Sequence, residues 1–345
     1  MALRNIRNIF HLKRWIKCCQ TLYCVPLLIC TLLLFMHILK VYQNFQNYLS
    51  VKVMGRGNIN DHEKEGELTL ITAYFNIGSF KKGPHLIYSP SRYYTWMKNF
   101  RSVNNCVILY TDVIDLSVQF ELYRAHFPKH MTKVFIVNQT SLWAFQLKAR
   151  IEEIYNQPGY PKYYPNVGVP AYSSAMHAKY ELMEQVIKEK LFRTKYIAWI
   201  DIGYFRKKEP GCFKMETPKD IRDDHILFSQ VDFFKHQLNL TEIIYTSRLY
   251  IACGFFIGRP DNLMLFIEDY KSAVERLLEM NLMNSDQQVL YILYSLKLSF
   301  HPRIPIQTFF NPMSLKKGRN DRWFFLGKLC QRFIKLNDSV DTCIA

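Results

Sequence analysis

The sequence predicts an α/β domain built on a mostly parallel β-sheet and preceded by a single transmembrane helix. From Leu68 onwards, short runs rich in β-branched and aromatic residues alternate with longer helical segments, which is the pattern of a layered α/β domain. The run Tyr196–Ile200 is apolar throughout, as expected of a central strand buried on both faces. A charge-free stretch near the amino terminus has the length of a membrane span.

The amino terminus predicts a single-pass type II membrane anchor. Residues 18–39 contain no charged side chain, and a helix of this length crosses the roughly 30 Å core of a bilayer. Five basic and no acidic residues precede it, at Arg4, Arg7, Lys13, Arg14 and Lys17. By the positive-inside rule, residues 1–17 form a cytosolic tail and the remainder lies across the membrane. We therefore expect an uncleaved anchor in the Golgi or another membrane of the secretory pathway.

The region after the anchor predicts a stem followed by a lumenal domain. Residues 40–66 are polar, with glycines and a charged cluster, and would hold a globular domain of residues 67–345 away from the membrane. That domain carries three sequons for N-glycosylation, at Asn138, Asn239 and Asn337. Its five cysteines could form disulfides in an oxidising lumen, with at least one thiol left over.

The first half of the domain predicts three strands and two helices. The strands are expected at residues 68–75, 106–110 and 133–137, and the helices at residues 93–100 and 141–155. Ser141 can cap the second helix. Asp112 follows the second strand almost directly, so it places a carboxylate at a strand end.

The long helix before the central strand carries the next candidate residue. Residues 157–174 are rich in Pro, Tyr and Gly and predict a loop, after which Ser173 or Ser174 can cap a helix that runs to about Lys190. Lys179 lies off the apolar stripe of this helix, which favours a solvated surface lysine over a functional one.

The last third predicts the remaining elements. Strands are expected near residues 226–228, 250–258 and 298–300, and helices at residues 261–280 and 285–295. Gly254 in the second of these strands indicates a bulge or a close approach of a ligand, with plain sheet packing as an equal alternative. Asp286 and Gln287 would occupy the exposed first turn of the last helix, and His301 follows the last strand.

The composition points to an anionic partner. The formal charge of +16 is strongly basic, which favours a nucleotide or sugar phosphate, an acidic glycan or a membrane surface. No RNP, zinc-finger or basic-helix pattern occurs, so we expect no binding to nucleic acid. No basic Gly-Ser/Thr phosphate loop follows the first strand, which disfavours a sulfotransferase.

Four polar residues at element ends suggest nucleotide-sugar transfer. Asp112, Asp201, Asp286 and His301 would gather at one edge of an α/β sheet, where such folds bind ligands. A nucleoside diphosphate leaving group can be neutralised by Mg²⁺ or Mn²⁺ held by one or two carboxylates. We expect Asp201 and His301 as metal ligands, and Asp286 as the catalytic group that orients or deprotonates an acceptor hydroxyl.

The domain resembles the HtrL/YibB-like family in six segments: Thr69–Gly78, Tyr110–Asp112, Tyr172–Lys179, Trp199–Arg206, Gly254–Gly258 and Asp286–Gln287. The resemblance implies a GT-A-like, three-layer nucleotide-diphospho-sugar transferase fold. The anchor, the stem, the sequons and the polar residues around Asp201 favour a glycosyltransferase with a glycan or glycoconjugate acceptor. The resemblance also implies a set of binding residues. The donor would be bound by Thr72, Tyr74, Asp112, Lys179, Asp201 and Arg206, and the acceptor by Gly254, Phe255 and Gln287.

One position departs from the pattern of such enzymes. Gly203 stands where the second carboxylate of their Asp-x-Asp motif is expected, which puts the use of a divalent cation in question. Lys179 or Arg206 could neutralise the phosphates instead, because a half-buried cation at 4 Å is worth roughly 4 kcal/mol at an effective dielectric of about 20. The alternative is a catalytically inactive, membrane-anchored module of the same fold that binds a glycan.

Overall fold

The computed structural model describes residues 66–334, except residues 84, 208, 210 and 314–319. The predicted cytosolic tail, the anchor, all but the last residue of the stem and the sequon at Asn337 lie outside the described residues. Within the described part of the chain, no helix combines the length and apolar character that crossing a bilayer requires.

A seven-stranded sheet forms the centre of the domain, with the strand order β10-β8-β9-β6-β1-β4-β5. Its strands are β1 (Leu68–Tyr74), β4 (Val107–Thr111), β5 (Thr132–Ile136), β6 (Tyr196–Ile200), β8 (Ile226–Gln230), β9 (Ile251–Gly258) and β10 (Ile306–Phe309). Strand β9 is antiparallel to β6 and β8, whereas the other neighbouring pairs in this sheet are parallel. The prediction of an α/β domain with a mostly parallel sheet is confirmed.

The order of the strands reverses at β1. From β1 the chain builds β4 and then β5 on one side, and it returns to pair β6 on the other side of β1. Strands β1 and β6 are parallel, so they end at the same edge of the sheet. Tyr74 is the last residue of β1, and Asp201 comes directly after β6, so both lie at that edge. In open α/β sheets, ligands bind outside the carboxyl ends of the strands at such a reversal.

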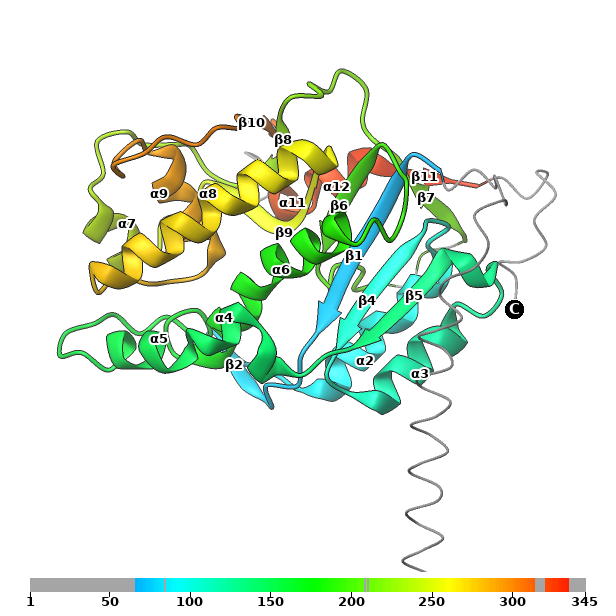
Figure 1. Ribbon diagram of the computed structural model, residues 1–345, viewed down its shortest axis with the longest axis horizontal. Coiled ribbons are helices and arrows are strands. Elements are labelled where there is room, and N and C mark those ends of the chain that lie inside the picture. Colours follow the sequence, from blue (N-terminus) through cyan, green and yellow to red (C-terminus); the bar gives the residue numbers. More distant parts are fainter. Residues whose placement is uncertain (1–65, 84, 208, 210, 314–319, 335–345) are drawn as a thin grey trace, which may run out of the picture. The chain divides into compact units, whose positions relative to one another are not determined.

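Helices cover both faces of the sheet (Figure 1). The α-helices are α2 (Pro90–Met97), α3 (Ile114–Tyr123), α4 (Trp143–Gln146), α5 (Lys148–Tyr155), α6 (Pro170–Lys188), α7 (Leu240–Tyr245), α8 (Pro260–Glu279), α9 (Asp286–Tyr294), α11 (Asn320–Trp323) and α12 (Phe325–Cys330). Short 3-10 helices occupy Lys98–Ser102, Lys129–Met131 and Gln139–Ser141. Two small antiparallel pairs lie outside the main sheet: β2 (Phe80–Lys82) with β3 (Leu86–Tyr88), and β7 (Phe213–Met215) with β11 (Gln331–Phe333).

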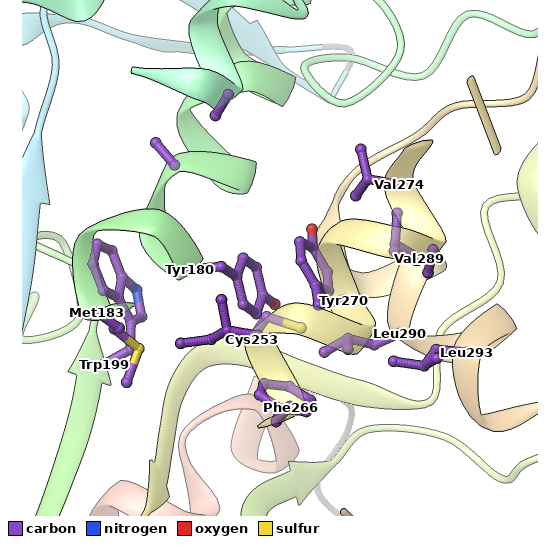
Figure 2. Packing of buried hydrophobic residues seen from close by; sticks show 14 of the residues in the cluster. Tyr180, Met183, Trp199, Cys253, Phe266, Tyr270, Val274, Val289, Leu290 and Leu293 are labelled. Carbon is purple, nitrogen blue, oxygen red and sulfur yellow. The ribbon is translucent and has the colours of Figure 1, made fainter. Parts of the chain in front are cut away.

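Two apolar clusters hold these layers together. Neighbouring residues of β1 enter different clusters, Leu70 with α2, α3 and α12 and Ile71 with α6, α8 and α9, because successive side chains of a strand point to opposite faces. In the second cluster, Tyr180 of α6 stacks on Tyr270 of α8 with ring centroids 3.5 Å apart (Figure 2). Such packing fixes α6 against the sheet, and α6 carries Lys179.

Three sequence predictions about local structure were wrong. Residues 298–300 form no strand, and the edge strand is β10, four residues that begin one residue after Pro305. A three-residue apolar run is too short to distinguish a strand from a turn. Helix α6 begins at Pro170 rather than at Ser173 or Ser174, because proline suits the first helical turn. The helix expected over residues 141–155 is divided into α4 and α5.

The described cysteines differ in their bonding state, and both described sequons lie at the surface. Cys212 is disulfide-bonded, whereas Cys106, Cys253 and Cys330 are buried thiols. Asn138 and Asn239 are both exposed. Each also caps a helix through its side-chain oxygen, Asn239 in a capping box with Glu242.

Candidate functional site

Two adjoining cavities open at the carboxyl edge of β1 and β6. The larger, which we call the polar cavity, has a volume of about 440 Å³, and the smaller, which we call the aromatic cavity, about 100 Å³. They share the lining residues Lys82, Tyr172, Met176, Asp201, Gly203 and Arg206. The cavities therefore meet at the residue that follows the central strand, at the edge where the topology places a ligand site.

The two cavities differ in chemistry. The aromatic cavity lies between the end of β1 and α2, and its rings come from Tyr74, Phe75, Phe80, Tyr88, Tyr93, Trp96, Tyr172 and Trp199. The polar cavity is bounded by α6, by Gly254 of β9, by the first turn of α9 and by the exposed rings of Tyr163 and Tyr164. One compartment offers flat apolar faces and the other offers charges and backbone groups.

Asp201 is held at the mouth by its own strand and by β9. Its backbone N–H donates to the carbonyl of Gly254 at 2.8 Å, and its Oδ1 accepts from Nε1 of Trp199 at 2.8 Å. A Cβ at position 254 would lie 3.1 Å from Oδ2 of Asp201, so the glycine leaves room for the carboxylate. The side chain of Asp201 is 39% exposed, which leaves it accessible from both cavities.

Lys179 joins Asp201 to Asp286 in the wall of the polar cavity. Its Nζ lies 2.8 Å from Oδ2 of Asp286 and 3.5 Å from Oδ1 of Asp201, and it donates to the carbonyl of Cys253 at 3.0 Å. Only 1% of the Lys179 side chain and 3% of the Asp286 side chain are exposed. Burial alone would lower the pKa of Lys179, but the two carboxylates raise it, so the ammonium stays charged. Burial raises the pKa of Asp286 in spite of the nearby ammonium.

The predictions that Lys179 and Asp286 are exposed to solvent were wrong. Lys179 is buried rather than solvated, because Ala178, Tyr180 and Leu182 are buried too and α6 is covered over a wider arc than one stripe. Asp286 is buried rather than exposed, because Lys179 of α6 reaches the first turn of α9 and pairs with it.

Two further cations line both cavities. Arg206 has its guanidinium 5.2 Å from the ring of Trp96 and 5.3 Å from that of Phe324, and its Nε donates to the carbonyl of Gly203. The ammonium of Lys82 lies 5.0 Å from the ring of Tyr88. Burial, followed by the charges of Arg206 and Lys179, lowers the pKa of Lys82 to about 8, against the pull of Asp201.

Lys82 was not predicted from the sequence. It ends the three-residue strand β2, which is too short to show a periodic pattern, and an identical side chain precedes it at Lys81. The turn signal of Gly83 directly after the lysine pair was the available indication that a hairpin was present.

The structure brings seven of the predicted binding and catalytic residues to the cavities: Tyr74, Lys179, Asp201, Arg206, Gly254, Asp286 and Gln287. Thr72 and Phe255 line neither cavity and are buried. Phe255 follows Gly254 in β9 and so points to the opposite face, where its ring centroid is 5.5 Å from that of Tyr204.

Asp112 and His301 also stay outside the cavities. Asp112 accepts hydrogen bonds from the backbone N–H of Asn76 and from Nε2 of Gln139, so it fixes the loop after β1. His301 is exposed in the segment before β10, whose amino end lies at the edge opposite Asp201 because β10 runs parallel to β8. The expected metal pair of Asp201 and His301 is therefore not assembled. Among the described residues, no group of three or more His, Cys, Asp or Glu side chains could hold a metal ion.

Sequence comparisons identify the family. A family model described as a bacterial protein of unknown function, HtrL_YibB, matches residues 66–302. The chain belongs to the HtrL/YibB family. Protein HtrL of Escherichia coli strain K12 is similar to it, with 24% identity over 242 residues, which covers 66% of this chain and 83% of that protein. The HtrL/YibB match includes the cavity residues of both compartments except Trp323 and Phe324.

Proposed function

We propose that this member of the HtrL/YibB family is a glycosyltransferase with a GT-A-like fold, which transfers a sugar from a nucleotide-sugar donor to a glycan or glycoconjugate acceptor. One observation carries the proposal. Two cavities of different chemistry meet at Asp201, at the edge of the sheet beside β1, where the strand order reverses, and cationic side chains line the junction. A nucleotide sugar has the matching order of parts: an aromatic base, an anionic diphosphate and a polar sugar.

The aromatic cavity suits the nucleoside. A base can lie against rings such as those of Tyr74, Tyr93 and Trp96, and stacking on aromatic side chains is worth roughly 1–3 kcal/mol per base. These rings also pack on one another, with centroids 5.8 Å apart for Tyr74 and Tyr93 and 5.3 Å for Tyr93 and Trp96. The cavity walls are therefore supported before any ligand binds.

The polar cavity suits the sugar and its acceptor. In our proposal Asp201 accepts the proton of the acceptor hydroxyl, whose oxygen then bonds to the sugar carbon as the bond from that carbon to the diphosphate breaks. We assign this role to Asp201 rather than to Asp286 because Asp201 is 39% exposed and Asp286 is 3% exposed. Asp286 then acts through Lys179, which it holds 3.5 Å from Asp201.

We further propose that the domain faces the lumen of the Golgi or another secretory compartment, anchored by residues 18–39. The charge-free span with basic residues before it supports this topology. Exposed sequons at Asn138 and Asn239 and the disulfide at Cys212 agree with an oxidising, glycosylating compartment.

Nucleoside diphosphates are expected to stabilise the protein against heat. A ligand at a hundred times its dissociation constant adds about 2.7 kcal/mol to the free energy of unfolding, because it binds the folded state alone. The measurement is the Tm of the purified full-length chain with UDP, GDP, CDP or ADP, with and without Mn²⁺. Uridine and inorganic pyrophosphate serve as controls for the two halves of the ligand. If none of the four nucleotides raises Tm, the proposal fails.

A glycan-binding module without transfer activity is the second candidate. Gly203 in place of a second carboxylate favours it, and the exposed rings of Tyr163 and Tyr164 beside the polar cavity could stack on sugars. This candidate predicts binding to a glycan array without any nucleotide effect on Tm. It also predicts that Asp201→Asn leaves glycan binding intact.

A further inference from the structure

We propose that this site binds the diphosphate of its donor without a divalent metal ion, and that Lys82 and Arg206 neutralise the phosphates in its place. The inference rests on the proposed function, since it concerns the same nucleotide. It assigns a binding role to Lys82, which neither the sequence patterns nor the family match singled out.

The protein oxygen atoms that line the cavities do not suit the coordination of a divalent metal ion. Such an ion is usually held by one or two carboxylates together with phosphate oxygens and water. Asp201 and Asp286 are the carboxylates among the described lining residues. Oδ2 of Asp286 lies 2.8 Å from the ammonium of Lys179, and Oδ1 of Asp201 accepts from Trp199. Oδ1 of Asp286 accepts from the backbone N–H of Gln287. Oδ2 of Asp201 is therefore the lining carboxylate oxygen left to contact a ligand, among the residues that the structure describes.

The neighbouring position cannot supply a second carboxylate without rearrangement. A Cβ at Gly203 would lie 2.8 Å from the Trp96 ring, which is closer than real side chains approach. The same ring lies 5.2 Å from the guanidinium of Arg206. The Trp96 indole thus occupies the space that a side chain at position 203 would need. The same indole contacts the guanidinium of Arg206.

The charges at the junction favour an anion over a cation. Lys82, Lys179 and Arg206 contribute three positive charges to the lining of the cavities, and Asp201 and Asp286 contribute two negative ones. Lys179 is engaged by both carboxylates, whereas the structure gives Lys82 and Arg206 no ion-pair partner among the described residues. A divalent cation added beside them would be repelled by both, and a diphosphate would be attracted by both.

The two side chains also have the right chemistry for a diphosphate. The guanidinium of Arg206 offers a planar fork of donors that matches two phosphate oxygens, and the rings of Trp96 and Phe324 hold it in place. The ammonium of Lys82 is a compact point charge at the end of β2. Arg206 lowers the pKa of Lys82, because the two positive charges repel each other in the free protein, and a bound anion would relieve that repulsion.

The test is calorimetric titration of the purified full-length chain with UDP and with GDP, once in EDTA and once in Mn²⁺. We expect at least one nucleotide to bind in EDTA with a dissociation constant within about threefold of its value in Mn²⁺. Binding that requires Mn²⁺ would overturn the inference and leave the proposed function standing. Binding of neither nucleotide under either condition would overturn both.

Variants locate the effect at the two cations. Lys82→Ala and Arg206→Ala are each expected to weaken nucleotide binding in EDTA by tenfold or more, with no loss of Tm in the absence of nucleotide. Lys81→Ala and Lys207→Ala are matched controls, because both neighbours are exposed and line neither cavity. Arg206→Lys keeps the charge without the fork and should bind with intermediate affinity. Equal affinities for wild type, Lys82→Ala and Arg206→Ala would contradict the inference.

Discussion

Asp201→Asn is expected to lower the turnover number of sugar transfer by about 10²–10⁴-fold, the range for removing a positioned general base. The amide keeps the size of the side chain and can still accept the hydrogen bond from Nε1 of Trp199, so the local structure should survive. Lys179 also keeps Asp286 at 2.8 Å. The measurement is the rate at which nucleoside diphosphate is released from the donor in the presence and absence of acceptor.

The affinity of this variant for nucleotide separates two roles of the carboxylate. If Asp201 acts on the acceptor, its removal should leave the dissociation constant of the nucleoside diphosphate unchanged or make it smaller, because a like charge has gone. If Asp201 instead held a metal ion that binds the diphosphate, Asp201→Asn should make this dissociation constant larger. Asp115→Asn, an exposed aspartate on α3, is the control and should retain full activity. Turnover by Asp201→Asn above about a tenth of the wild-type value would rule out the assigned role.

Lys179→Met is expected to destabilise the fold by roughly 3–5 kcal/mol, the cost of removing one partner from a buried ion pair. Methionine fills a similar volume, so the loss reports mainly the carboxylate of Asp286, which would remain 3% exposed and without its ammonium. Denaturation in urea measures the change in the free energy of unfolding. Lys188→Met is the matched control on the same helix, since its pair with Glu184 is at the surface and such pairs are worth about 0–1 kcal/mol.

The loss in Lys179→Met should depend on pH in a defined direction. Burial raises the pKa of Asp286, and the loss of the ammonium raises it further. The fold then favours the protonated acid relative to the unfolded chain, whose carboxyl has a pKa of about 3.9. The variant should therefore lose stability relative to wild type as pH rises above about 4, where the carboxyl ionises in the unfolded chain but resists ionisation in the fold. The double variant Lys179→Met with Asp286→Leu should recover much of the loss, and failure to recover any would contradict the pairing.

The central strand and its closing carboxylate were predictable because their signal is local. An apolar run such as Tyr196–Ile200 is long enough to specify a buried strand, and parallel pairing places Asp201 at the ligand edge. The β1 and β4 strands were predictable for the same reason. Their ends bring Tyr74 to the cavity, while Asp112 serves the loop beside it.

The rest of the site depends on contacts between distant segments, which a single sequence does not encode locally. Lys179 looks like a surface lysine until α9 supplies Asp286, 107 residues further along the chain. Lys82 lies on a three-residue strand whose position follows from the hairpin with β3. The predicted strand before His301 failed because β10, which forms the edge, begins only at Ile306.

The most direct test of the whole account is a crystal structure of the protein saturated with the nucleoside diphosphate that raises Tm most. We expect the base in the aromatic cavity and the diphosphate between Lys82 and Arg206, next to Asp201. A nucleotide bound elsewhere on the molecule, with both cavities empty at saturation, would contradict the account.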